Sequence, residues 1–130
     1  MNRIKDHVSR IVPEIISNVV LEQYRKVNCG SFFISVEPPN DCVFVGDDFY
    51  LVKNLLLVEN EKIKVVATKL KKTGDLDDYP LKSSLINIFK VETEEENNYI
   101  TFDLRDIKYK CIKFQLSEKE WAVFPLNHFT

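Results

Sequence analysis

Cysteine and histidine are the side chains in this sequence most able to carry chemistry, and their spacing argues against an enzyme. The cysteines, Cys29, Cys42 and Cys111, are odd in number and widely spaced, which fits neither a disulfide framework nor a C-x2-C zinc pair. Nucleophilic catalysis needs a general base, usually histidine, beside the nucleophile. His7 and His128 lie near the two ends, and no motif connects either to a cysteine. We therefore predict reduced thiols, no catalytic residue, no metal and no cofactor.

Carboxylates gather in three short segments, residues 47–48, 75–78 and 92–96. Such clusters could hold Ca²⁺ or Mg²⁺, but the calcium-loop pattern with its internal glycine and final glutamate is absent. Phosphate-binding loops need several closely spaced glycines, and the whole chain has 3. We interpret each acidic segment as a solvated turn, and we predict that the protein is not an enzyme.

Lysines crowd one predicted hairpin and form the first candidate for a partner-binding surface. They are Lys62, Lys64, Lys69, Lys71 and Lys72, and a second set follows at Lys108, Lys110 and Lys113. Lysine on a sheet edge also prevents aggregation, which is a competing explanation. A basic strip would instead face an acidic protein or a phosphate backbone. The formal net charge of −2 disfavours nucleic acid, although a local patch leaves that partner open.

Aromatic side chains are the second candidate for a binding surface, because Tyr and Trp often anchor protein interfaces. We select Tyr50, Tyr79 and Trp121 as partner-binding candidates. The phenylalanines are assigned to the core, Phe114 and Phe124 among them.

Apolar residues recur at three- and four-residue spacing over residues 4–27, which predicts an amphipathic helix that Pro13 kinks or breaks. Asn28 and Gly30 supply a helix stop. The apolar stripe of this helix would pack on the domain or form a homodimer. The residues proposed for self-association are Val8, Val12, Ile15 and Val19.

After Gly30 the pattern becomes strand-like, with runs at 31–37, 42–45, 49–58, 62–70, 99–104, 107–116 and 121–126. About seven short strands with frequent turns predict a mainly β (α+β) domain, a small bent sheet or barrel with an N-terminal helix. We assign residues 1–30 to the helical segment and 31–130 to the β-rich barrel-like domain. No apolar run approaches the ~18–20 residues of a membrane span, and the charged N-terminus is unlike a signal peptide, so we expect an intracellular protein.

Two resemblances accompany these patterns. Residues 49–126 are similar to a domain of uncharacterised open reading frames in invertebrate genomes, several linked to mobile elements, through the segments 51–54, 79–91, 104–111 and 123–126. Residues 46–51, 87–89 and 107–111 also resemble core strands of the bromo-adjacent homology (BAH) domain. Residues 68–71 read TKLK where that family has an aromatic-rich stretch, which puts methyl-lysine recognition by an aromatic cage in doubt.

The resemblance implies a BAH-like protein-interaction module, a nuclear location and a nucleosome or chromatin protein as partner. Composition and pattern alone predict a non-enzymatic binding domain. Two alternatives stay open: a small acidic inhibitor of the immunity-protein type, and a weak nucleic-acid binder that uses the lysine strips.

Overall fold

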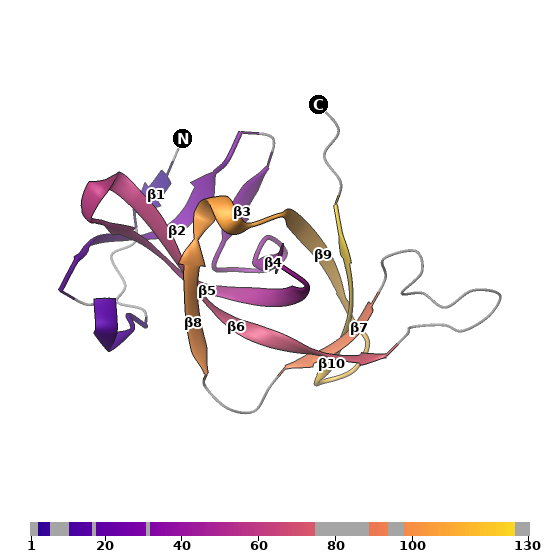
Figure 1. The fold of residues 1–130 in the computed structure, drawn as a ribbon. Helices are drawn as coiled ribbons and strands as arrows, with labels where there is room; N and C mark the ends of the chain where they lie inside the picture. The colour runs from indigo at the N-terminus through magenta and orange to yellow at the C-terminus, as the bar shows by residue number, and fades with distance from the viewer. Residues whose placement is uncertain are drawn as a thin grey trace.

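The computed structural model describes residues 3–5, 11–16, 18–30, 32–74, 89–93 and 98–126 of the chain (Figure 1). Short 3-10 turns, η1 (Glu14–Ile16), η2 (Glu59–Glu61) and η4 (Leu104–Asp106), separate some of its strands. The strands are β1 (Arg3–Lys5), β2 (Val20–Asn28), β3 (Phe33–Ser35), β4 (Cys42–Val45), β5 (Asp48–Val58), β6 (Lys62–Gly74), β7 (Phe89–Thr93), β8 (Tyr99–Asp103), β9 (Tyr109–Gln115) and β10 (Glu120–Pro125).

The long hairpin of β5 and β6 organises the fold. The two strands pair antiparallel from Tyr50↔Lys69 to Val58↔Lys62. The register shifts between Val52 and Asn54, which marks a β-bulge and bends β5. Each strand shares its other edge between two neighbours: β5 pairs with β4 and β2, and β6 pairs with β7 and β8.

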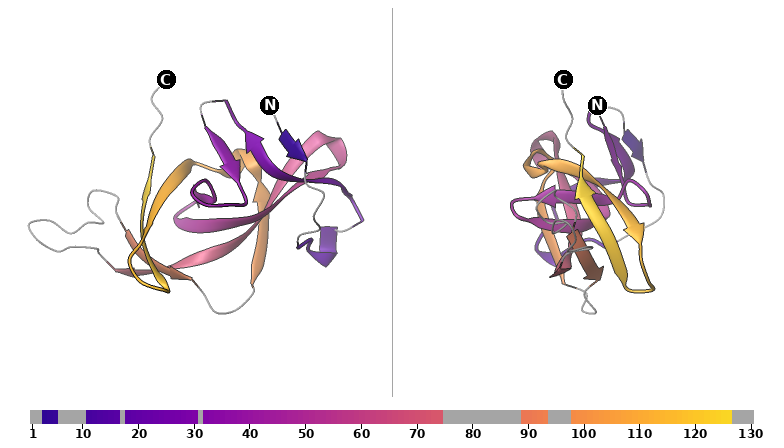
Figure 2. Two further views of the ribbon diagram at one scale, coloured as in Figure 1. Left: turned by 180° about the vertical axis from the view of Figure 1, so that it is seen from behind. Right: turned by 90° about the vertical axis from the view of Figure 1, so that its right-hand side faces the viewer.

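Six strands close into a ring in the order β5, β4, β9, β10, β7 and β6, because β5 and β6 also pair with each other. All these pairings are antiparallel. Beyond the ring, β2 extends the sheet from β5 and carries β1 and β3, while β8 extends it from β6. Figure 2 shows the ring from two further directions, with the N-terminal strands at one end.

Three apolar clusters fill the fold. The ring encloses a cluster that includes Phe49, Leu70 and Cys111. Leu55 and Val65 belong to a second cluster on one face of the flanking sheet, and Leu56 and Val66 to a third on the opposite face. Because both faces are covered at this point, β5 is apolar without alternation from residue 55 to 58.

The prediction of a mainly β domain is confirmed, whereas the helix predicted over 4–27 is wrong for residues 4–5, which lie in β1, and for residues 20–27, which lie in β2. Buried Tyr24 and Val27 are three residues apart, a spacing that imitates a helix. The register with β1 passes from Tyr24 to Lys26, so Arg25 is a bulge residue. A bulge changes the two-residue period of a strand, which gives these two buried residues of β2 their helix-like spacing. Residues 6–10 of the predicted helix lie outside the described residues.

Candidate functional site

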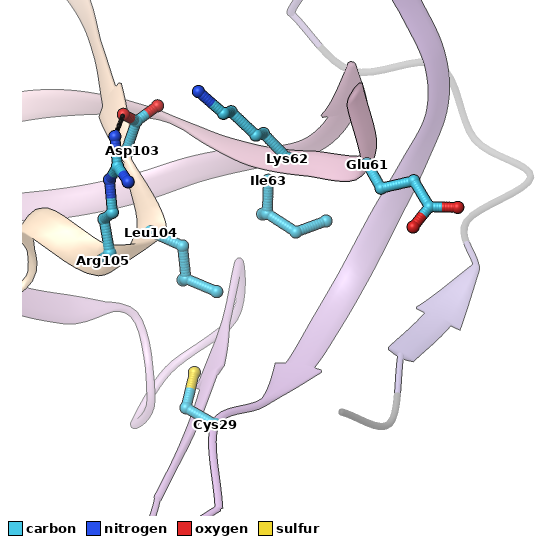
Figure 3. Close-up of a pocket in the computed structure, with 7 residues that line it drawn as sticks. All are labelled: Cys29, Glu61, Lys62, Ile63, Asp103, Leu104 and Arg105. Atoms are coloured by element: carbon cyan, nitrogen blue, oxygen red, sulfur yellow. Dashed lines mark ion pairs between the residues drawn. The ribbon is translucent and has the colours of Figure 1, made fainter. Parts of the chain in front are cut away.

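An apolar pocket of about 350 Å³ opens beside the start of β6 (Figure 3). We call it the Cys29 pocket, and its lining residues are Cys29, Glu61, Lys62, Ile63, Asp103, Leu104 and Arg105. In the close-up the thiol of Cys29 and the side chains of Ile63 and Leu104 point toward one another. The charged residues stand around this apolar centre, which makes the pocket an apolar cavity with a rim of mixed charge.

Three separate segments build the Cys29 pocket. Cys29 directly follows β2, Glu61 and Lys62 lie at the turn into β6, and Asp103 closes β8 just before η4. Glu61 has a φ of 56°, a left-handed backbone conformation that costs a residue with a side chain roughly 1–2 kcal/mol. Strained residues persist where the surrounding structure fixes them, and they are frequent at binding sites.

An ion pair fixes one side of the rim. Lys64 Nζ lies 2.6 Å from Asp103 Oδ1, and Arg105 lies 3.6 Å from the other carboxylate oxygen. The hydrogen bond from Lys64 is the main cause that lowers the pKa of Asp103, and the charges of Lys64 and Arg105 add to it. The backbone N–H of Asp103 donates to Asp106 Oδ2 at 3.2 Å, which completes a capping box on η4. The rim is therefore held in place on the side of β8.

The thiol of Cys29 is poorly suited to nucleophilic chemistry. Burial raises the pKa of Cys29, so the protonated form dominates at neutral pH, while the thiolate is the reactive species. His7 and His128 lie outside the described residues. The Cys29 pocket therefore presents this cysteine as a protonated thiol beside apolar side chains.

The five selected lysines are spread along β6 and do not form a single basic cluster. Lys64 pairs with Asp103, and Lys69 lies 3.5 Å from Asp48. Lys72 donates to the backbone carbonyl of Asp47 and lies 5.2 Å from the ring centre of Phe89. Lys62, at the Cys29 pocket, and Lys71 are exposed. A strand rises about 3.3 Å per residue, so Lys62 and Lys72 lie roughly 30 Å apart along an extended strand.

The selected aromatic residues do not converge either. Tyr50 is half-buried against the cluster of the flanking sheet, with its ring 5.5 Å from that of Phe102. Trp121 packs against the cluster inside the ring of strands. These two side chains therefore belong to different cores and do not build a shared cage, while Tyr79 lies outside the described residues.

Trp121 borders a buried ion pair that the sequence did not suggest. Lys113 Nζ lies 2.8 Å from Asp41 Oδ1 and 3.0 Å from Oδ2, and the two side chains are only 5% and 8% exposed. The same ammonium group lies 4.8 Å from the ring centre of Trp121. Lys113 faces the inside and its neighbour Phe114 faces out, an arrangement opposite to the usual preference of these residue types.

Phe114 thus forms part of an exposed apolar patch, and its assignment to the core is wrong. Its side chain is 57% exposed, and its ring lies 5.9 Å from that of Phe124 in a stacked arrangement. Leu116 adds a further exposed apolar side chain. The sequence does not reveal this patch, because Ile112, Phe114 and Leu116 alternate as a buried strand face would.

Two residues proposed for self-association lie within the fold of one chain. Val12 and Val19 pack against the cluster of Leu56, Val58 and Val66. Asn54 is fully buried and holds this segment by donating a hydrogen bond of 2.8 Å to the carbonyl of Ile11. Val8 and the side chain of Ile15 lie outside the described part of the chain.

Two negative findings apply to the described ranges. Within them, no group of three or more His, Cys, Asp or Glu side chains could hold a metal ion. None of the helices in the same ranges has the length and apolar character needed to cross a membrane.

The ring of antiparallel strands and its flanking sheet define the protein as a mainly β domain with an open apolar pocket. Residues 6–126 match a domain of unknown function (DUF8592), and the chain belongs to that family. Searches of curated proteins and of solved structures give no significant match. The family match provides no link to the BAH domain or to mobile elements.

Proposed function

We propose that this domain is a non-enzymatic protein-interaction module that receives an apolar side chain of its partner in the Cys29 pocket. The observation that carries the proposal is the pocket itself, about 350 Å³ with an apolar centre and a rim of fixed charge. Interface energy concentrates where a partner fills such a hollow and excludes water.

The rim supports selection among partners. Lys62 and Arg105 are exposed cations, while Glu61 is an exposed carboxylate. Charges at the edge of an interface affect the association rate and the choice of partner more than the affinity. A partner segment with an apolar anchor flanked by both charge signs fits this pocket.

The experiment compares the proteins that co-purify with the wild type, with Leu104→Asp and with Leu116→Asp. Leu104 lines the Cys29 pocket, whereas Leu116 is an exposed leucine in the patch with Phe114 and therefore serves as the matched control. Loss of the partner in Leu104→Asp alone supports the proposal. Loss of the partner in Leu116→Asp alone indicates that the partner binds the patch with Phe114 instead. Retention of the partner in both variants refutes the role of the pocket. Circular dichroism verifies that each variant is folded.

The finer form of the proposal is a BAH-like fold that docks on chromatin in the nucleus. It predicts binding to reconstituted nucleosomes that tolerates higher salt, with no binding to matched free DNA. Absence of binding to both would refute the chromatin form and leave a dedicated protein partner. Direct nucleic-acid binding has weaker support, since Lys64, Lys69 and Lys72 are engaged within the chain.

A further inference from the structure

A second hollow of about 320 Å³ lies between β2, β3 and the loop that follows β3. Arg25, Lys26, Phe33, Glu37 and Asn40 are among the residues that line it. We call it the Phe33 groove. It is separate from the Cys29 pocket, because the two hollows share no lining residue.

Two lysines converge on the ring of Phe33. Lys26 Nζ lies 3.7 Å from the ring centre and Lys110 Nζ lies 4.5 Å from the same centre, which places the two ammonium nitrogens within about 8 Å of each other. Lys26 comes from β2 and Lys110 from β9, so the fold itself brings the like charges together.

Among the described residues, the partners of these two lysines are neutral. Lys110 donates a hydrogen bond to the side-chain oxygen of Asn40, and both ammonium groups contact the face of the Phe33 ring. Among the described residues, neither Lys26 nor Lys110 forms an ion pair with a carboxylate. Burial, and then the charge of Lys26, lowers the pKa of Lys110. An anion between the two ammonium groups would relieve this repulsion.

We infer that the Phe33 groove is an oxyanion-binding site for a phosphate or carboxylate group, with Lys26 as a lining cation and Lys110 as a second cation beside the lining residues Phe33 and Asn40. Arg25 adds a third cation on the groove wall, whereas Glu37 is the carboxylate that lines it. Hydrogen bonds from ammonium groups to an oxyanion are stronger than those between neutral groups. The Asn40 side chain accepts from Lys110 through its oxygen, which leaves its NH₂ as a further donor.

The test is a titration of the ¹⁵N-labelled chain of 130 residues with inorganic phosphate, with sodium chloride added to keep the ionic strength constant. We expect saturable shifts of the backbone amides of Lys26, Phe33, Asn40 and Lys110. Lys26→Gln and Lys110→Gln should each weaken phosphate binding at least tenfold. Lys71→Gln removes the same charge from an exposed position on β6 and should leave binding unchanged.

Acetate at the same ionic strength distinguishes the two sources of the oxyanion. Saturation by acetate at the same amides supports a carboxylate ligand, and a response to phosphate alone supports a phosphoryl ligand. Shifts that do not saturate, that spread over all lysines, or that Lys71→Gln reduces equally would overturn the proposal. Lys26→Gln serves as the second variant if Lys110→Gln does not fold, because the two half-buried lysines lie on different strands, β2 and β9.

Discussion

Breaking the buried ion pair between Asp41 and Lys113 is expected to destabilise the protein more than breaking an exposed ion pair would. At 2.8 Å and an effective dielectric constant near 20, the gross attraction is about 6 kcal/mol. Desolvation of two nearly buried charges offsets most of this, so the pair adds little net stability. Removing one partner, however, leaves the other charge buried and uncompensated, which costs about 3–5 kcal/mol.

The assay is urea unfolding of Asp41→Ala, Lys113→Met and the double variant, followed by circular dichroism and by fluorescence of the single tryptophan, Trp121. Each single variant should lose about 3–5 kcal/mol, and the double variant should lose clearly less than the sum. Lys113→Met also removes the contact with the Trp121 ring, which is worth about 1–2 kcal/mol. We therefore expect Lys113→Met to be the more damaging single change.

Lys69→Met is the matched control, since Lys69 and Asp48 form an exposed pair at 3.5 Å. Its cost should stay within about 1 kcal/mol. If Asp41→Ala lowers the free energy of unfolding no more than Lys69→Met does, burial does not raise the cost of breaking this ion pair. The same conclusion follows if the effects of Asp41→Ala and Lys113→Met add in the double variant.

Three further predictions concern other contacts. Asn54→Leu should cost about 1–3 kcal/mol in urea unfolding, because it leaves the carbonyl of Ile11 without its donor; an unchanged midpoint would contradict this. In the folded protein, Cys29 should react slowly with a thiol reagent while the two fully buried cysteines do not react until unfolding, and three equal rates would refute their burial. Because the pKa of Asp103 is lowered in the folded protein, its carboxylate stabilises the fold at pH values above the ordinary pKa of 3.8. This stabilisation is lost as the pH falls through the lower pKa of the folded state. The stability difference between the wild type and Lys64→Met should therefore shrink below pH 3.8, and a difference that is constant with pH would refute the role of Lys64.

Local patterns in the sequence predicted the strands that carry strong turn signals. The runs at 49–58 and 62–70 correspond to β5 and β6. The runs at 107–116 and 121–126 correspond to β9 and β10. Here turn residues and β-branched side chains act over a few positions, so one sequence is sufficient.

The sites depend on pairings between distant segments, which a single sequence does not reveal. The Cys29 pocket requires β2 to pair with β5 and β6 to pair with β8, so that Cys29, Ile63 and Leu104 meet. The Phe33 groove requires β9 to close the ring beside β4, which brings Lys110 to Phe33. The inward position of Lys113 opposes residue preference and follows only from its partner Asp41.

The hairpin of β5 and β6, which the ring and the flanking sheet share, also determines how the protein unfolds. Both strands contribute side chains to the cluster inside the ring and to the clusters of the flanking sheet. Opening either half would expose buried side chains of this hairpin, so we expect the ring and the flanking sheet to unfold as a single cooperative unit. In native-state hydrogen exchange, the amides of β5 and β6 should exchange only through global unfolding. Those of β3, a three-residue strand at the edge of β2, should exchange through local fraying.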